Sequence, residues 1–308
     1  MNVLITGANG FVGAALMERL ARQVGCVAIG AARHPARLAA GEQRFAAMPD
    51  LGPSADWRPL LNNVDVVVHC AARVHVMRET DPDPLAAFVH ANTDGTLQLA
   101  RQAAENGVGR FVFVSSIGVH GATTSGQPFC ENDDPAPHSP YAVSKHLAEQ
   151  GLREISKASG LEVTIVRPVL IYGRGAHGNL QKLARLVQRG VPLPFASVRN
   201  RRTLVSAGNL ADLLAICASH PAAAGEAFIS GDPVDISTPE IIMHMARSLG
   251  VKAQLVPFPT SFLRAGLRSV GKADMANQLL GSLQVDTSKA RRVLGWVPPE
   301  RPDTALWA

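Results

Sequence analysis

A tyrosine and a lysine in the middle of the chain have the side-chain types and the spacing of a proton-transfer pair. Tyr141 and Lys145 lie four residues apart in a stretch with helical spacing, so their side chains share one helix face. The lysine charge would favour the phenolate and lower the pKa of Tyr141 toward neutral pH. Such a tyrosine can exchange a proton with an alcohol while a hydride is transferred. From the spacing alone, an ordinary exposed helix pair is the alternative.

A serine upstream completes the candidate set. Ser115 and Ser116 follow the apolar run Arg110–Val114, and Ser139 and Pro140 have the types of a helix cap and a first-turn proline before Tyr141. Successive strand side chains point to opposite faces, so we expect Ser116 to bond the reacting oxygen and Ser115 to cap the sheet.

The chain begins with a pattern that suits a dinucleotide. The apolar run Val3–Ile5 is followed by the glycine-rich turn Thr6–Gly13 and then by helical spacing over Ala14–Ala21. Small residues let the backbone approach a pyrophosphate, and the helix N-terminus supplies N–H donors. Together with the Tyr141 and Lys145 pair, this turn predicts a dinucleotide-dependent enzyme.

Apolar runs alternate with helical segments as far as residue 171, which predicts an α/β fold with a doubly wound parallel sheet. The expected elements after the first turn are Val27–Ile29, Val64–His69, Pro84–Asn106, Arg110–Ser116, Ser139–Ser156 and Val163–Pro168. We expect residues 1–171, with a return segment at about 207–231, to form a dinucleotide-binding domain. Residues 172–206 and 232–308 would form a smaller substrate-binding lobe of mixed structure.

Composition narrows the class further. The 308 residues are 46% hydrophobic and 18% charged, as in a globular protein, and no segment has the ~20 apolar residues of a membrane span. We expect a cytoplasmic protein that does not insert into membranes. The four cysteines are scattered without metal-ligand spacing, so no metal is expected.

Several other polar features receive a structural interpretation. The net charge is +5, but aromatic residues make up only 5%, which argues against a nucleic-acid partner. We interpret His69, His75 and His120 as satisfied or substrate-lining side chains rather than catalytic ones. The basic amphipathic stretch Phe262–Arg268 is interpreted as a lobe helix packed on the core, with membrane contact as the alternative.

At this point the chain resembles the extended short-chain dehydrogenase/reductases, and within them the UDP-glucose 4-epimerase group, which includes bacterial 4-keto-sugar reductases of surface polysaccharide synthesis. The resemblance implies a Rossmann-type sheet and hydride chemistry at C4 of a nucleotide-linked hexose. Ser116, Tyr141 and Lys145 would be catalytic, with Lys145 also bonding the nicotinamide ribose. The matching motifs are Thr6–Gly13, Asp65–Ala72, Asn92–Thr96, Val114–Ser116, Ser139–Lys145, Arg167–Pro168 and Leu294–Trp296.

The resemblance also implies a set of residues around the cofactor. NAD users usually place an acid at the end of the second strand. Here Ala32 stands near that position with Arg33 beside it, and Arg33, assisted by Arg37, could pair with a 2′-phosphate. NADP(H) is therefore favoured; NAD(H), with Arg33 as a solvated loop charge, is the alternative. The implied cofactor-binding residues are Gly7, Asn9, Gly10, Phe11, Val12, Gly13, Arg33, Asp50, Leu51, Cys70, Ala71, Ala72, Asn92, Tyr141, Lys145 and Pro168.

For the substrate, the resemblance implies a UDP-sugar held by Asn179, Leu180 and Arg202, besides the contact with Ser116. The alternative for Arg202 is an exposed place in the basic loop Arg199–Arg202. A second arginine of the epimerases is missing: Ala276–Gln278 stand in that region.

The residues at which this chain departs from the family pattern narrow the reactions that we expect. The acid pair of 4,6-dehydratases is replaced by Ile117 and Gly118, which cannot exchange a proton. We favour reduction of a UDP-4-keto-6-deoxyhexose by NADPH over 4-epimerisation of UDP-glucose or UDP-N-acetylglucosamine. An NADPH reductase of an apolar ketone is a further alternative. The resemblance also implies a homodimer.

Overall fold

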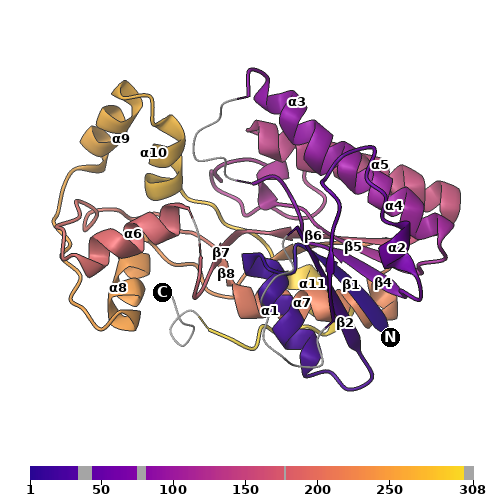
Figure 1. Ribbon diagram of the computed structural model, residues 1–308. Helices are drawn as coiled ribbons and strands as arrows, with labels where there is room; N and C mark the ends of the chain where they lie inside the picture. The colour runs from indigo at the N-terminus through magenta and orange to yellow at the C-terminus, as the bar shows by residue number, and fades with distance from the viewer. Residues whose placement is uncertain (34–43, 75–80, 177, 302–308) are drawn as a thin grey trace.

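Seven parallel strands form the centre of the protein, as the computed structural model shows for the residues it describes, 1–33, 44–74, 81–176 and 178–301 (Figure 1). Their order is β3-β2-β1-β4-β5-β6-β9. The order reverses between β1 and β4, and in such sheets the crevice at the carboxyl ends of the strands at this point binds ligands. The predicted Rossmann-type fold is confirmed. The strands are β1 (Asn2–Thr6), β2 (Val27–Ala32), β3 (Arg44–Ala47), β4 (Val66–His69), β5 (Arg110–Val114), β6 (Glu162–Pro168) and β9 (Ala227–Ser230).

Helices cover both faces of this sheet and bury its strands. All five residues of β5 and all four of β4 are buried, which is why these runs are almost continuously apolar. One face packs against α1 (Phe11–Ala21), α7 (Ala207–Ser219) and α11 (Ser288–Leu294), and the other against α2 (Arg58–Leu61), α4 (Gly95–Glu105) and α5 (Pro140–Ser159). Residues 207–230 therefore return to the sheet, as α7 and then β9.

The region between Pro84 and Asn106 differs from the single helix that its spacing predicts. It forms α3 (Pro84–Phe88), a π-helical turn η1 (Val89–Asp94) and then α4. The π-turn has tertiary causes: the Thr93 hydroxyl donates to the carbonyl of Ser144 at 2.8 Å, and a Cβ at Gly95 would lie 2.8 Å from the amide nitrogen of Gly52. Inserted π-turns occur frequently at functional sites.

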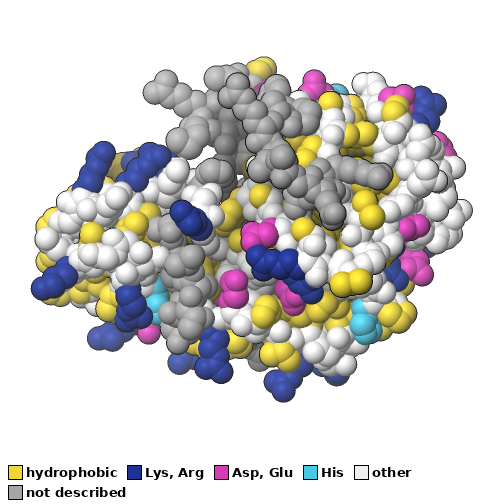
Figure 2. Space-filling view, turned by 60° about the horizontal axis from the view of Figure 1, so that its bottom comes forward, with side chains coloured by type: hydrophobic (Ala, Val, Ile, Leu, Met, Phe, Trp, Pro, Cys, Tyr) yellow, Lys and Arg dark blue, Asp and Glu magenta, His cyan; other side chains and the backbone are white. Residues whose placement is uncertain are grey.

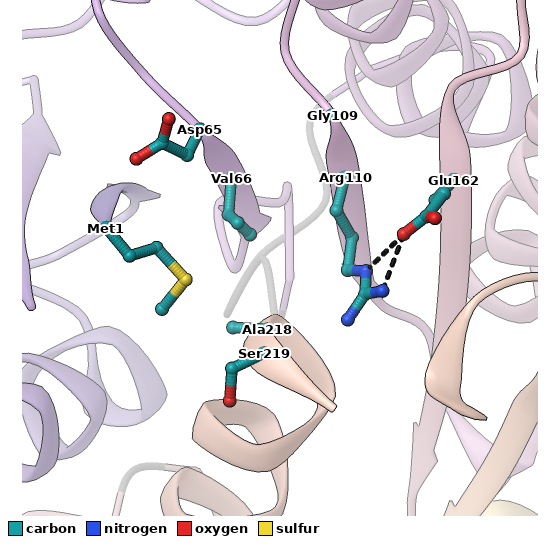
Figure 3. Close-up of a pocket in the computed structure, with 8 residues that line it drawn as sticks. All are labelled: Met1, Asp65, Val66, Gly109, Arg110, Glu162, Ala218 and Ser219. Atoms are coloured by element: carbon teal, nitrogen blue, oxygen red, sulfur yellow. Dashed lines mark hydrogen bonds and ion pairs between the residues drawn. The ribbon is translucent and has the colours of Figure 1, made fainter. Parts of the chain in front are cut away.

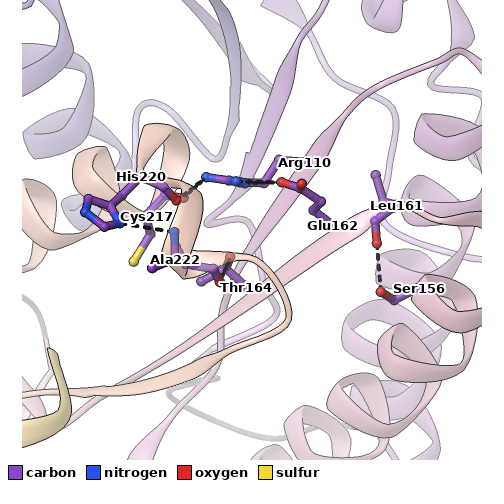
Figure 4. Close-up of polar contacts among 9 residues, drawn as sticks. Arg110, Ser156, Leu161, Glu162, Thr164, Cys217, His220 and Ala222 are labelled. Atoms are coloured by element: carbon purple, nitrogen blue, oxygen red, sulfur yellow. Dashed lines mark hydrogen bonds and ion pairs between the residues drawn. The ribbon is translucent and has the colours of Figure 1, made fainter. Parts of the chain in front are cut away.

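The amino edge of the sheet contains a cavity of about 300 Å³ beside Arg110 (Figure 3). The guanidinium of Arg110 donates to the Glu162 carboxylate and to the carbonyl oxygens of Cys217 and His220, at 2.5–3.1 Å (Figure 4). These bonds connect β5, β6 and the end of α7. Because the cavity lies at the edge opposite the ligand crevice and its arginine is satisfied, we assign this cluster a structural role.

The remaining elements surround a core of their own, and we call them the smaller lobe. They are β7 (Leu170–Tyr172), β8 (Leu204–Ser206), α6 (Asn179–Gln188), α8 (Thr238–Ser248), α9 (Thr260–Ser269) and α10 (Ala273–Leu280). Tyr172, Leu183 and Ile242 are among the buried side chains at its centre. No helix in the described part of the chain is long and apolar enough to cross a membrane.

Candidate active site

The glycine-rich turn lies between β1 and α1, at the carboxyl edge of the sheet. Gly7 has a φ of +68°, and a Cβ there would lie 3.0 Å from backbone atoms of Ala71, so the position requires glycine. A Cβ at Gly13 would lie 2.2 Å from the carbonyl oxygen of Gly7, because α1 packs directly on the turn. The first-turn N–H groups of Phe11 and Val12 have no partner within the helix. This donor set fits a pyrophosphate.

The other predicted cofactor residues lie around this turn. Cys70, Ala71 and Ala72 follow β4, where the amide of Ala71 donates to the Thr6 hydroxyl at 3.2 Å. Their contacts with a cofactor remain predictions. Asn9 and Gly10 are exposed in the turn, and Asp50 is also exposed. Leu51 is partly buried against the core beneath α2, α4 and α5, and Pro168 is buried at the end of β6.

The three predicted catalytic residues lie on neighbouring elements at the carboxyl edge of the sheet. Ser116 directly follows β5, and its hydroxyl accepts the amide of Gly118 at 3.1 Å. Tyr141 and Lys145 lie on the first two turns of α5, which Ser139 caps by accepting the amide of Ala142 at 3.2 Å. Ser115 is buried, and its hydroxyl donates to Glu149 on α5 at 2.6 Å rather than capping the sheet as expected.

Burial controls the protonation of this pair more than their mutual charge does. Lys145 is almost fully buried, with its Nζ atom 4.1 Å from the centre of the Phe113 ring, and burial lowers its pKa to about 7. Burial likewise raises the pKa of Tyr141 to about 12. The expectation that Lys145 lowers the pKa of Tyr141 is therefore wrong, because desolvation disfavours both charged forms.

A buried ion pair behind Lys145 was not anticipated from the sequence. Arg167 donates to both carboxylate oxygens of Glu149, at 3.0 and 2.6 Å, and neither side chain is exposed by more than 4%. Burial alone would raise the pKa of Glu149, but Arg167 and Ser115 hold it below its usual value. A signal was present in the sequence: Glu149 follows Lys145 by four residues, so the two share one face of α5.

Asn92, one of the implied cofactor-binding residues, lies in the π-turn and connects three segments. Its amide oxygen accepts the backbone N–H of Arg73 at 2.7 Å, and its amide nitrogen donates to the carbonyl of Arg73 and the hydroxyl of Ser144. The side chain therefore fixes the loop after β4 against α5, beside Lys145.

Both ring nitrogens of the buried His69 have a hydrogen-bond partner, in agreement with its interpretation from sequence, whereas the buried Nδ1 atom of His120 has none in the structure. The Thr96 hydroxyl donates to the carbonyl of Asn92, so the Nε2 atom of His69 donates to Thr96 and its Nδ1 atom accepts from Thr6. Burial lowers the pKa of His69 to about 3. His120 accepts from Arg167 at 2.8 Å, and His75 lies outside the described residues.

The end of β2, beside the glycine-rich turn, contains no acid. The amide of Ala8 donates to the carbonyl of Ala31 at 3.1 Å, and Ala32 ends the strand. Arg33 follows and is exposed, whereas Arg37 lies outside the described residues.

The predicted substrate residues converge on the end of α10. Asn179 begins α6, is exposed and donates to Gln278 at 2.7 Å, whereas the side chain of Leu180 is buried in the smaller lobe. Arg202 is 5% exposed, so the alternative of an exposed loop residue is wrong. Its Nη1 atom donates to the carbonyl of Gly281 at 3.1 Å.

Arg202 is also incompletely paired. Its buried Nε atom has no hydrogen-bond partner in the structure, and burial lowers its pKa to about 10. Gly281, its carbonyl partner, lies against Thr123 in the loop that follows Ser116: a Cβ at Gly281 would lie 2.8 Å from the Thr123 methyl. Arg202 thus connects the smaller lobe with the catalytic edge, and a buried guanidinium with a free donor fits an anion.

Comparison with known proteins agrees with this geometry. The model of the NAD dependent epimerase/dehydratase family matches residues 3–231. A UDP-glucose 4-epimerase from Vibrio cholerae is 40% identical over 301 residues, which cover 97% of this chain and 91% of that protein. The chain belongs to the NAD dependent epimerase/dehydratase family.

One further relative and one solved structure are also similar to this chain. A 2-alkyl-3-oxoalkanoate reductase from Stenotrophomonas maltophilia is 27% identical, over 97% of this chain and 95% of that protein. A UDP-glucuronic acid 4-epimerase from Bacillus cereus, solved in complex with NAD, has a TM-score of 0.80 at 20% identity and covers 99% of this chain and 96% of that one. This last likeness shows the fold alone. The predicted assignment to the extended short-chain dehydrogenase/reductases is confirmed.

Among the described residues, no group of three or more His, Cys, Asp or Glu side chains could hold a metal ion. Ile117 and Gly118, which replace the acid pair of dehydratases, are both buried beside Ser116.

Proposed function

We propose that this enzyme transfers a hydride at C4 of a UDP-linked hexose, and that its reaction is the NADPH-dependent reduction of a UDP-4-keto-6-deoxyhexose. The observation that carries the substrate class is Arg202, a buried guanidinium whose Nε atom has no hydrogen-bond partner. Gly281, which accepts from Arg202, packs against the loop that follows Ser116. A diphosphate satisfies such a donor, whereas an apolar ketone leaves it unpaired.

The chain offers a complete set of residues for the cofactor. Gly7, Gly10 and Gly13 let the backbone approach the pyrophosphate, Lys145 reaches the nicotinamide ribose and Arg33 pairs with a 2′-phosphate. When bound, the cofactor supplies or accepts the hydride at the sugar carbon. The relative solved with NAD supports the dinucleotide, and the missing acid at the end of β2 supports NADP(H).

The proton is delivered by Tyr141. A reductase needs a protonated phenol that can give its proton to the developing alkoxide, and burial keeps Tyr141 protonated at neutral pH. Ser116 donates a hydrogen bond to the same oxygen, without giving up its proton, and fixes its position. Lys145 and Asn92 hold α5 and the loop after β4 in place around the reacting carbon.

The second candidate is a UDP-glucose 4-epimerase, which the 40% identical relative from Vibrio cholerae favours. An epimerase must first remove a proton from C4–OH, so it needs the phenolate of Tyr141, and it must keep its oxidised cofactor bound. The two readings therefore differ in the initial protonation state of Tyr141 and in cofactor exchange.

One turnover panel separates the candidates. The protein is incubated with a UDP-4-keto-6-deoxyhexose and NADPH or NADH, and separately with UDP-glucose and NAD. We expect stoichiometric NADPH oxidation with the keto sugar and no formation of UDP-galactose. Conversion of UDP-glucose without net change in cofactor absorbance would replace the reductase with the epimerase. Reduction of a 3-oxoalkanoate with no activity on UDP-sugars would contradict both.

The cofactor preference has its own test. Arg33→Asp, placed at the end of β2, should raise the KM for NADPH at least tenfold and lower that for NADH, because the new carboxylate repels the 2′-phosphate and accepts ribose hydroxyls. An unchanged KM ratio would show that Arg33 does not contact the cofactor.

A further inference from the structure

Positive charge is concentrated in two stretches of the chain. Residues 163–211 contain eight Lys and Arg residues, residues 241–273 contain five, and neither stretch contains an Asp or Glu. Together they hold 13 of the 30 basic residues and none of the 25 acidic ones. Both contribute to the smaller lobe, where basic side chains gather in the space-filling view (Figure 2). Such charge asymmetry within a chain indicates an anionic partner at this end.

The second stretch also exposes large apolar side chains. Phe262 on α9 is 68% exposed, Val270 just after the helix is 63% exposed and Phe258 just before it is 42% exposed. All ten phenylalanines lie in the described part of the chain, and Phe258 and Phe262 are its two exposed ones. Neither residue is therefore part of the lobe core.

One side of the helix packs against the smaller lobe despite these exposed residues. Leu263 and Leu267 pack against the core of the smaller lobe, and Arg264 donates to the carbonyl of Leu280 at 3.4 Å. The expected packing of this stretch on the core is thus present, but it uses only one side of α9. The outer side has no protein covering it among the described residues.

Cations border this outer side. Arg268 in the last turn of α9, Lys272 just beyond it and Lys252 before it are all exposed. The helix lies at the end of the smaller lobe that is far from the sheet (Figure 1). A surface of apolar side chains bordered by cations, on an anchored helix, is the pattern of proteins that lie on a bilayer.

We propose that residues 256–272, comprising α9 and its flanking turns, form a docking surface for an anionic phospholipid bilayer. Phe258, Phe262 and Val270 enter the boundary between headgroups and acyl chains, while Arg268 and Lys272 contact the lipid phosphates. Pairing with a second copy would bring like charges together, and a nucleic acid would leave the apolar side chains unused. This surface is peripheral and needs no helix that crosses the membrane. It does not depend on the proposed function.

The test uses the full chain and vesicles of defined composition. Co-sedimentation is measured with pure phosphatidylcholine and with phosphatidylcholine containing one quarter phosphatidylglycerol, at 0.1 M and 0.5 M NaCl. Each cation near the surface is worth about fivefold in partitioning. We expect at least tenfold stronger binding to the anionic vesicles, lost at high salt because the charges are screened. Equal binding to both compositions, or none to either, would overturn the proposal.

Matched variants locate the surface. Phe262→Ser with Val270→Ser, and Arg268→Glu with Lys272→Glu, should each lower anionic vesicle binding at least tenfold. The controls are Val297→Ser, at the same 63% exposure as Val270, and Lys157→Glu, whose side chain is 73% exposed; both should bind as the parent does. Equal loss in the controls would overturn the proposed location.

The remaining readouts exclude other occupants. All four proteins should keep the parent unfolding midpoint and the parent turnover without vesicles, because the changed side chains are exposed and lie outside the catalytic set. Molecular mass by light scattering should not change either. A dimer that dissociates in the Phe262→Ser, Val270→Ser protein would assign the surface to a second copy and contradict the bilayer.

Discussion

The ammonium of Lys145 lies over the ring of Phe113, with the Nζ atom 4.1 Å from the ring centre. A cation–π contact partly compensates an ammonium for lost water, by about 2 kcal/mol when the contact is desolvated. It does not restore full hydration, and burial still lowers the pKa of Lys145 to about 7. The buried Lys145 therefore lowers the stability of the folded protein, and the fold tolerates this loss at the candidate active site.

Lys145→Met should make the protein more stable near neutral pH, although turnover is lost. The pKa of Lys145 is about 7 in the folded protein against 10.5 in a free side chain, so the unfolded chain binds more protons between these values. The parent free energy of unfolding then rises with pH across this window, by about 1.4 kcal/mol per unit. The variant lacks this slope. The gain in free energy of unfolding of Lys145→Met over the parent is largest at pH 7 and below, and disappears near pH 10.5.

Urea unfolding at several pH values measures this difference. The matched control is Lys157→Met, where an exposed lysine is removed, and its curve should run parallel to that of the parent. A parallel curve for Lys145→Met as well would mean that Lys145 remains charged in the folded protein.

Tyr141→Phe should lower kcat by about 10²–10⁴ while cofactor binding, followed by nicotinamide fluorescence, changes little. The ring and its contact with Phe88, at 6.1 Å between centres, are kept, and only the proton donor is removed. The chain has one other tyrosine, Tyr172, whose hydroxyl donates to Asp232 at 2.8 Å. Tyr172→Phe should lose about 1 kcal/mol of stability and keep its turnover. Undiminished activity of Tyr141→Phe would remove that residue from the mechanism.

The Glu149 and Arg167 pair should behave as a unit. Glu149→Met or Arg167→Met alone leaves a buried charge without its partner and should cost about 3–5 kcal/mol, whereas the double variant should lose much less than the sum. The contribution of this ion pair to the free energy of unfolding is present above about pH 4.5. It is lost at lower pH, since the folded-state pKa of Glu149 lies below its usual value of 4.5.

A double-mutant cycle from urea unfolding at pH 7 measures the coupling. Arg153→Met is the control, because Arg153 meets the same carboxylate at 3.3 Å with a side chain that is 43% exposed, and it should cost less than about 1 kcal/mol. Additive losses for Glu149 and Arg167 would show that they act independently.

Arg202→Met should raise the KM for the nucleotide-sugar at least tenfold without lowering the stability of the free protein. A guanidinium with an unpartnered Nε atom contributes little to folding, since its burial is not repaid by hydrogen bonds. Steady-state kinetics and thermal unfolding measure the two effects. Arg201→Met is the neighbouring exposed control and should change neither. A KM that stays within twofold for Arg202→Met would place the diphosphate elsewhere.

Two helical glycines should respond in opposite directions to alanine. At Gly13 the new Cβ would lie 2.2 Å from the carbonyl oxygen of Gly7, so Gly13→Ala should destabilise the protein and weaken cofactor binding. At Gly266 in α9 no atom lies within 4 Å of such a Cβ, and Gly266→Ala should stabilise by about 0.5–1 kcal/mol. Thermal unfolding with and without cofactor tests both; a stabilised Gly13→Ala would contradict the close packing.

Local patterns were sufficient for much of the fold. The apolar strand runs, the glycine turn and the Ser139 cap each act over a few residues, and the parallel order follows from their alternation with helices. Tyr141 and Lys145 were found because helix geometry places residues four apart on one face. β3 was missed because its four residues, Arg44–Ala47, lie in a stretch without clear periodicity.

The tertiary structure determines the burial of these residues, and with it their pKa values and partners. Burial lowers the pKa of Lys145, whose ammonium lies over Phe113, thirty-two positions earlier. The π-turn depends on Ser144 and Gly52, and Arg202 pairs with segments as far along the chain as residue 283. Sequence spacing determines which side chains share a face, because backbone geometry is local. Desolvation is set by everything packed around a group, and that packing exists only once distant segments have come together.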